Sequence, residues 1–229
     1  MKIGGLQRVS LIDYPGLISA VVFLQGCNFR CPYCHNPELV DPGLFQPCLR
    51  EEDFFDFLET RKGKLDAVSI TGGEPAIHND LAPFINKIKK MKFAIKLDTN
   101  GSQPKVIKNL LDKKMLDFIA MDIKAPLAKY NSIAGVSVDS DAIKESIQTI
   151  LKAKIPHEFR TTIVESQLGE KDILQIGELI SGASHYVLQK FASTKTLDKK
   201  FLKEKSFSDE RLQKIKSHLE QQITSVTIR

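Results

Sequence analysis

Three of the four cysteines in this 229-residue chain fall within eight residues, and their spacing is typical of a metal site. Cys27, Cys31 and Cys34 form a C-x3-C-x2-C pattern, so three thiolates on one short loop can face a common centre. A structural zinc ion would need a fourth ligand, which His35 or Cys48 could supply, but no second C-x2-C or H-x3-H pair is present. A [4Fe–4S] cluster usually takes four thiolates, so three would leave one iron open to another ligand. The spacing favours the cluster, and we expect Cys48 to be a free thiol.

The composition, 42% hydrophobic and 27% charged, is that of an ordinary globular protein. The longest apolar run covers residues 20–24, far short of the about 18 residues that a membrane span needs. The first residues contain no apolar signal segment, so we expect a cytoplasmic protein in which clustered thiols stay reduced. Disordered, disulfide-scaffold and transmembrane classes are thereby excluded.

The chain is modestly basic, with a formal net charge of +5. Its lysines gather in two stretches, over residues 87–96 and 195–205. Solvated helix faces and loops explain such stretches in most proteins, and a docking surface for an acidic partner or nucleic acid is the alternative. We expect no nucleic-acid partner and no membrane partner.

Strand-like and helix-like patterns alternate from residue 19 onward. Six strands are expected over residues 19–24, 66–71, 93–98, 117–122, 157–164 and 184–190. Apolar residues at helical spacing lie between and after them, over 81–91, 106–111, 143–151 and 212–219, the last with a cap at Ser208. This alternation predicts an α/β fold with a parallel sheet and right-handed crossovers.

Nearly every unusual polar cluster maps to a strand, mostly at its carboxyl end, where ligands bind in parallel α/β proteins. In chain order these are the cysteine segment, Gly72-Gly73-Glu74-Pro75, Asp98 with Asn100, Asp122 with Lys124, Arg160 and Gln189. Their convergence predicts a binding site at one rim of the sheet.

The cysteine motif, with Tyr33 before its last cysteine, resembles the signature of radical S-adenosylmethionine (radical SAM) enzymes. Gly72-Gly73-Glu74-Pro75 is similar to their second motif. The segments over 10–16 and 25–37 resemble the activating enzymes of glycyl radical proteins, and most closely those of anaerobic ribonucleoside-triphosphate reductase.

The resemblance implies that Cys27, Cys31 and Cys34 bind three irons of one [4Fe–4S] cluster. S-adenosyl-L-methionine (SAM) would chelate the fourth iron through its amino and carboxylate groups. Glycines let a backbone come close to a ligand, and the family places Gly72, Gly73 and Glu74 at the amino end of SAM.

Two further pairs are expected to contact SAM. The resemblance places Tyr33 and His35 beside the adenine; the alternative for each is an exposed loop residue. Asp98 and Asn100 suit a ribose or methionine, whereas a helix cap or an Asn-Gly turn is the competing interpretation.

The remaining candidates carry charge or an amide. Asp122 and Lys124 resemble an Asp-x-Lys element of the activators, and alternate strand positions share a face, so both can reach one cavity; a surface ion pair is the alternative. Arg160 suits a carboxylate clamp or a structural salt bridge. Gln189 is a further expected SAM contact.

The predicted fold is a partial (β/α)6 TIM-like barrel that is open on one side, because a closed eight-stranded barrel typically takes about 250 residues. We expect a single radical SAM domain over 1–229. Its core covers about 16–192, and an N-terminal segment, 1–15, and a C-terminal helical extension, 193–229, pack on that core. The open side would admit a glycine-bearing loop of a partner protein.

The resemblance implies an activating enzyme that cleaves SAM reductively and generates a glycyl radical on a partner, with anaerobic ribonucleoside-triphosphate reductase as the expected target. Flavodoxin or ferredoxin would supply the electron, and no dedicated acid–base residue is needed beyond the cluster and SAM. The alternatives are a radical SAM enzyme acting on a small molecule, similar to 7-carboxy-7-deazaguanine synthase, and a zinc-binding interaction module.

Overall fold

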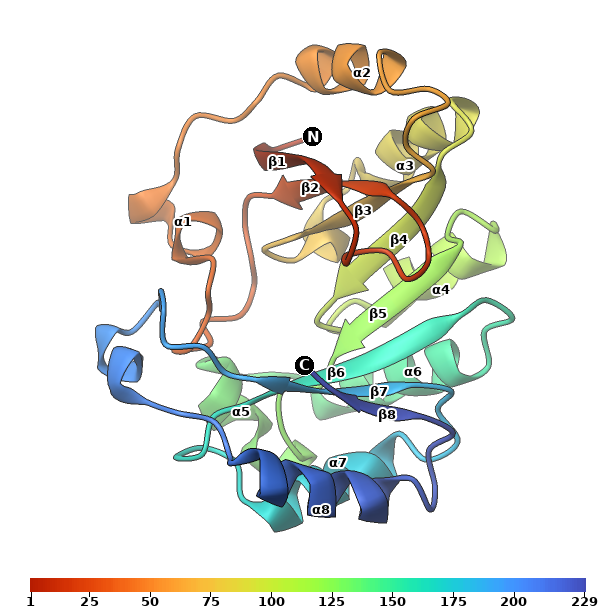
Figure 1. Ribbon diagram of the computed structural model, residues 1–229. Helices are drawn as coiled ribbons and strands as arrows, with labels where there is room; N and C mark the ends of the chain where they lie inside the picture. Colours follow the sequence, from red (N-terminus) through yellow and green to blue (C-terminus); the bar gives the residue numbers. More distant parts are fainter. The chain divides into compact units, whose positions relative to one another are not determined.

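The predicted alternation of strands and helices is present in the computed structural model, which describes residues 1–229 (Figure 1). One sheet holds eight strands in chain order: β1 (Ile3–Ser10), β2 (Ser19–Leu24), β3 (Ala67–Gly72), β4 (Ala94–Thr99), β5 (Phe118–Asp122), β6 (His157–Ile163), β7 (Tyr186–Lys190) and β8 (Val226–Ile228). β1 pairs antiparallel with β2, whereas β2–β3, β3–β4, β6–β7 and β7–β8 are parallel. β1 and β8 are the two edge strands and do not pair with each other, so the sheet is open. The predicted fold class is confirmed.

Helices follow the strands as the sequence predicts. They are α1 (Pro37–Val40), α2 (Glu51–Glu59), α3 (Leu81–Lys90), α4 (Pro104–Asp112), α5 (Tyr130–Ala134), α6 (Ser140–Leu151), α7 (Glu170–Leu179) and α8 (Asp209–Leu219), with short 3-10 helices at Pro42–Leu44, Pro75–Ile77, Leu127–Lys129 and Lys199–Lys203. The expected apolar faces are the buried ones: Leu81, Phe84, Ile85 and Ile88 of α3 are at most 2% exposed. None of the helices combines the length and the apolar character that crossing a membrane requires.

Six strands and helices lie outside the predicted set, namely β1, α1, α2, α5, α7 and β8, and so do the four 3-10 helices. β1 contains Gly4 and Gly5 and lacks an alternating pattern; β2 supplies the hydrogen-bonding partner that makes it a strand. β8 has three residues and lies in the segment expected to be a helical extension, where it pairs parallel with β7. The extension is therefore helix plus strand.

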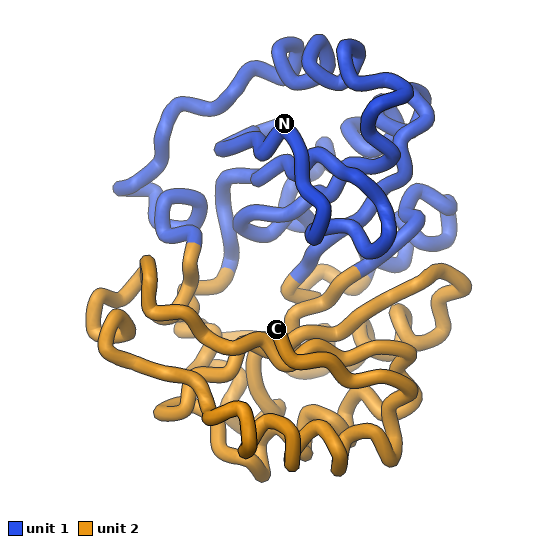
Figure 2. The backbone as a smooth tube through the Cα atoms, in the orientation of Figure 1, with its two compact units in different colours: residues 1–28, 36–99, 105–119 blue, residues 29–35, 100–104, 120–229 orange.

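Backbone contacts divide the chain into two compact units (Figure 2). Unit 1 comprises residues 1–28, 36–99 and 105–119, and unit 2 comprises 29–35, 100–104 and 120–229. The division passes through the cysteine motif, with Cys27 in unit 1 and the other two cysteines in unit 2. A single domain over the whole chain stays a prediction.

In unit 2, α8 packs closely on α7. A Cβ added to Gly177 of α7 would lie 2.3 Å from Cδ2 of Leu219, so the glycine permits the approach. Leu212, Ile215 and Leu219 of α8 are fully buried. Ser208 caps the helix as predicted, since its Oγ accepts a hydrogen bond from the backbone N–H of Arg211 at 3.4 Å.

Replacing Ser208 by alanine should lower the free energy of unfolding by about 1 kcal/mol, the usual cost of removing an N-cap side chain. Urea denaturation measures this change. Ser181→Ala serves as the control because that exposed hydroxyl makes no hydrogen bond, and it should be near neutral. Equal midpoints for the two variants would contradict the capping role.

Candidate functional site

The ends of β2 and β3 bring two of the predicted motifs side by side in unit 1. The parallel register places Leu24 opposite Gly72. The backbone N–H of Gly73 donates to the carbonyl of Leu24 at 2.8 Å, and that of Glu74 donates to the carbonyl of Gly26 at 2.8 Å. The Gly-Gly-Glu segment is thus hydrogen-bonded to the residues that lead into Cys27.

This contact requires glycine. Gly72 has φ +115°, and a Cβ on it would lie 2.4 Å from the backbone nitrogen of Leu24. A Cβ on Gly73 would lie 1.9 Å from the carbonyl oxygen of Gly26, far inside van der Waals contact. The two glycines therefore let two backbones meet directly at this strand end.

The carboxylate of Glu74 is held in one orientation. The residue is 1% exposed, and its Oε1 accepts hydrogen bonds from the backbone N–H of Ala76 at 3.0 Å and from the hydroxyl of Thr99 at 2.7 Å. Thr99 has no role among the residues predicted from sequence, although it stands between two predicted site residues at the end of β4. A fixed, buried carboxylate at a strand end suits the binding of a ligand ammonium.

Asp98 of β4 forms an ion pair with a lysine that sequence reasoning missed. Lys96 is 2% exposed, and its Nζ lies 2.5 Å from Oδ1 of Asp98 and 5.9 Å from the ring centroid of Phe118. The signal for it was available, because Lys96 and Asp98 occupy alternate strand positions, as do Asp122 and Lys124. The lysine holds the Asp98 carboxylate in place.

Asn100, in unit 2, forms the turn that was the alternative interpretation. Its Oδ1 accepts a hydrogen bond from the backbone N–H of Ser102 at 2.9 Å, and Gly101 has φ +77°. The residue is 6% exposed. Its side chain therefore shapes the loop after β4.

The turn that contains Cys31 and Cys34 rests on α5 within unit 2. The backbone N–H of Cys34 donates to the carbonyl of Cys31 at 3.0 Å, which closes the turn. The N–H of Arg30 donates to the carbonyl of Ala134 at 2.7 Å. The ring of Phe29 meets that of Tyr130 edge to face, with centroids 6.3 Å apart.

Tyr33 lies buried inside this turn. It is 4% exposed, so the alternative of an exposed loop residue is wrong for it. Its hydroxyl is buried without a hydrogen-bond partner in the chain. Burial raises the pKa of Tyr33 well above its ordinary value, and the neighbouring Cys31 adds to the shift, so the hydroxyl stays a donor. The Tyr33 hydroxyl is therefore free to donate a hydrogen bond to a water or to a ligand group.

Burial raises the pKa of the Cys31 thiol to about 11, while the positive charge of Lys124 opposes the shift. A bound metal would displace that proton. Within neither unit are three histidine, cysteine, aspartate or glutamate side chains grouped closely enough to hold a metal ion. The thiol pair on one turn, a nearby ammonium and the unsatisfied Tyr33 hydroxyl fit an anionic metal cluster in their donor chemistry.

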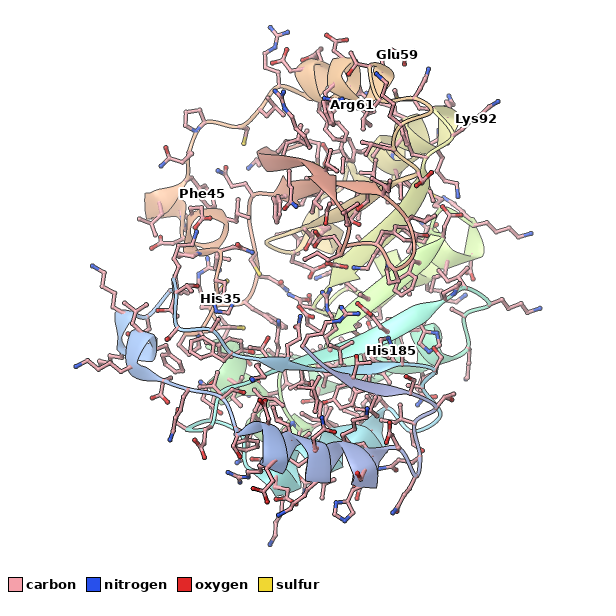
Figure 3. The ribbon with its side chains drawn as sticks, in the orientation of Figure 1. His35, Phe45, Glu59, Arg61, Lys92 and His185 are labelled. Atoms are coloured by element: carbon pink, nitrogen blue, oxygen red, sulfur yellow. The ribbon has the colours of Figure 1, made fainter.

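His35, labelled in Figure 3, contacts the segment after β7. Its ring stacks on Phe191, with centroids 5.3 Å apart and planes 13° apart, and its Nε2 lies 2.8 Å from the carbonyl oxygen of Ala192. Since a carbonyl only accepts, Nε2 carries the proton. His35 thus ties the cysteine turn to the chain that follows β7.

Asp122, Lys124 and Arg160 form one ion cluster in unit 2. Arg160 Nε lies 2.8 Å from Oδ1 of Asp122, and Lys124 Nζ lies 3.1 Å from Oδ2. The three side chains are 12–28% exposed, so the surface-pair interpretation is wrong. Arg160 forms the structural salt bridge that was its alternative.

The ion cluster fixes the charges of its members. Burial would raise the pKa of Asp122, but Arg160 and Lys124 outweigh it and hold that pKa far below its usual value. Burial would lower the pKa of Lys124, but the carboxylate of Asp122, which also accepts its hydrogen bond, outweighs burial and raises that pKa. Lys124 therefore stays protonated beside Cys31.

Gln189 stands apart from these contacts. It is half-buried near the end of β7, opposite Thr162 in the β6–β7 register, and its side chain makes no hydrogen bond within the chain. Its predicted role as a SAM contact stays a prediction, as do the ligand roles of the other residues.

Gly73→Ala should destabilise the fold by roughly 1–3 kcal/mol, because the new methyl group must push apart two backbones. Gly5→Ala is the matched control in the same unit, since its Cβ would meet Phe23 at an ordinary 3.7 Å. Urea denaturation compares the two. A Gly73→Ala midpoint equal to that of Gly5→Ala would contradict the proposed close approach.

Asp122→Asn should lower the free energy of unfolding by roughly 3 kcal/mol at pH 7, because it leaves two partly buried cations without their carboxylate. Asp209→Asn, which breaks an exposed pair with Lys190 at 2.7 Å, should cost less than about 1 kcal/mol. The pKa of Asp122 is depressed in the folded state, so its contribution is complete above the ordinary aspartate pKa and is lost as pH falls below it. The difference between wild type and Asp122→Asn should therefore shrink in acid; a constant difference would contradict the account.

Known proteins resemble this chain over most of its length. The radical SAM superfamily model matches residues 21–176, more than half of the chain. A Methanocaldococcus jannaschii protein assigned as a glycyl-radical enzyme activating enzyme is 34% identical over 235 residues, 99% of this chain and 95% of its own. The pyruvate formate-lyase-activating enzyme of Clostridium pasteurianum is 33% identical over 133 residues, about half of each chain.

The fold also matches a solved structure. Streptococcus suis SuiB bound to precursor peptide SuiA has a TM-score of 0.70 at 13% identity, covering 91% of this chain and 48% of that one, which shows the fold alone. The superfamily implies the use of SAM and an iron–sulfur cluster. The chain is an enzyme of the radical SAM superfamily and belongs, within it, to the family of glycyl-radical enzyme activating enzymes.

Proposed function

We propose that this enzyme holds one [4Fe–4S] cluster through Cys27, Cys31 and Cys34 and installs a glycyl radical on anaerobic ribonucleoside-triphosphate reductase. The observation that carries the proposal is the buried, unpartnered hydroxyl of Tyr33, which lies between the last two cysteines in sequence. The whole-length likeness to an activating enzyme supports the choice of a protein substrate. The segments over 10–16 and 25–37 support the reductase as the target.

Cys27, Cys31 and Cys34 would hold the cluster, and the bound cluster with SAM would supply reductive cleavage of the C5′–S bond and the abstraction of hydrogen from a glycine Cα. The chain contributes binding and charge. The ammonium of Lys124 and the hydroxyl of Tyr33 are two donors whose electrostatic influence reaches Cys31, and they would stabilise a thiolate or a ligand carboxylate there, because Cys31 is only 7% exposed.

The two glycines and Glu74 would bind the other end of SAM. Because Glu74 is fixed by Ala76 and Thr99, its carboxylate is pre-oriented for the amino group of SAM. Asp98, held by Lys96, would accept hydrogen bonds from the ribose hydroxyls. Further SAM contacts are proposed for His35, Asn100, Asp122, Arg160 and Gln189.

Cys31→Ala should lose the cluster and release no 5′-deoxyadenosine when reduced anaerobically with SAM. Cys48→Ala is the matched control, since this exposed thiol only contacts Gln25 Oε1 at 3.4 Å and should keep wild-type iron content. Iron, sulfide and zinc analysis with product chromatography measures the outcome. One zinc per wild-type chain, or iron loss in Cys48→Ala alone, would contradict the ligand assignment.

The target is tested by anaerobic mixing with an anaerobic ribonucleoside-triphosphate reductase, SAM and a reductant, followed by EPR. The proposal predicts a glycyl radical that depends on SAM and is absent with Cys31→Ala. SAM cleavage without a radical would overturn the assignment of this target and would favour another glycyl radical enzyme or a small-molecule substrate.

A further inference from the structure

Residues 191–205, which we call the strap, follow β7 and lie in the same unit as the cysteine turn (Figure 2). Their first two residues contact His35, through the ring of Phe191 and the carbonyl of Ala192. Farther along, the backbone N–H of Leu197 donates to the carbonyl of Cys34 at 3.1 Å, and that of Asp198 donates to the carbonyl of Pro32 at 2.8 Å. The strap is therefore fixed to the backbone of the turn at both of these points.

The strap is strongly cationic and exposed. Its charged residues are Lys195, Lys199, Lys200, Lys203 and Lys205 against Asp198 and Glu204, and all five lysines are exposed. Lys199, Lys200 and Lys203 form no ion pair. The carboxylate of Asp198 instead accepts a hydrogen bond from the backbone N–H of Lys200 at 2.9 Å. Leu202 is 41% exposed among them and offers an apolar contact.

The other lysine stretch differs in this respect. Lys87 pairs with Glu51 at 2.7 Å, and Lys89 pairs with Asp117 at 3.2 Å. Those two charges are compensated within the fold. Lys90 and Lys92 of that stretch are exposed and unpaired, whereas the strap has three unpaired lysines within five residues, on the segment bound to the cysteine turn.

We infer that the strap is the docking surface for an acidic electron-donor protein, an inference that rests on the proposed function. A cationic surface steers an acidic partner and raises its association rate. A protein bound to the strap lies against the turn that carries Cys31 and Cys34, so its electron has a short path to the metal site.

The electron transfer that this docking serves is balanced. One electron leaves the anionic hydroquinone of a flavodoxin, which becomes the neutral semiquinone and neither gains nor loses a proton. That electron reduces the oxidised cluster and lowers its total charge by one. No covalent bond between the two proteins forms or breaks.

The first test measures binding and needs no cluster. A fluorescently labelled acidic flavodoxin is titrated with the cluster-free protein at low and high salt. The triple charge reversal Lys199→Glu, Lys200→Glu and Lys203→Glu should weaken binding about tenfold or more at low salt and flatten its salt dependence. The matched control is the triple variant Lys64→Glu, Lys105→Glu and Lys113→Glu. It changes the net charge by the same amount, at exposed lysines without ion pairs, and should leave binding within a few-fold of wild type.

Equal weakening by both triple variants would show a net-charge effect and would overturn the docking surface. Unchanged binding of the strap variant would overturn it as well. A triple Lys→Gln variant, which removes the charges without reversing them, should fall between wild type and the reversal. Circular dichroism shows that each variant is folded.

The second test separates docking from chemistry in the cluster-loaded enzyme. With dithionite, a small reductant, the strap variant should release 5′-deoxyadenosine at the wild-type rate; with reduced flavodoxin, its rate should fall about tenfold or more. Equal loss with both reductants would place the strap in the site itself and overturn the inference. Loss of glycyl radical with normal flavodoxin-driven SAM cleavage would assign the strap to the target protein instead. Failure of the wild-type enzyme to cleave SAM with dithionite would refute the proposed function, a result distinct from these.

Discussion

The parallel register between β2 and β3 is the constraint on which the site depends. It places Leu24 opposite Gly72, and the chain then continues on one side into the cysteine motif and on the other into Gly73 and Glu74. Two backbone hydrogen bonds of 2.8 Å join the two segments. Because a side chain at Gly73 would strike the carbonyl of Gly26, a larger residue there would force the two backbones apart. A shift by one residue would separate the motifs and turn the side chains of the strand to the other face.

The second part of the motif is fixed by different means. The turn with Cys31 and Cys34 is held by a backbone hydrogen bond to Ala134 of α5 and by two backbone hydrogen bonds from residues 191–205. The ion cluster of Asp122, Lys124 and Arg160 determines the charge near Cys31. Burial keeps Tyr33 protonated, so its hydroxyl is available to a ligand. The site is thereby prepared for anionic ligands before any are bound, and preparation of this kind reduces the cost of binding.

Periodicity predicted the strands that are buried on both faces and the helices with a clear apolar stripe. All six predicted strands are present within about two residues of their expected limits, and the α3 stripe is buried as expected. β1 was not predicted because its two glycines and polar residues carry no pattern of their own; its partner strand determines it. α2 did carry a signal that we did not use, an acidic first turn before Phe54 and Leu58 at helical spacing.

For the site, cysteine spacing predicted which residues could bind a cluster. It did not predict the side-chain partners of the remaining site residues. Asp98 was named, whereas the buried Lys96 that pairs with it was not, because a lysine within a strand is usually exposed. Arg160 offered a clamp or a salt bridge, and only tertiary structure showed its pairing with Asp122. The contacts of His35 with Phe191 and Ala192 join residues more than 150 positions apart, a distance over which local pattern carries no information.

The central claim is that three thiolates leave one iron open to SAM. Electron–nuclear double resonance on the anaerobically reduced enzyme, with SAM labelled by 15N at its amino group and 13C at its carboxylate, tests it most directly. The account predicts hyperfine coupling from both labels, as expected when the amino acid end of SAM binds iron. A reduced cluster that shows neither coupling, with SAM demonstrably bound, would contradict it.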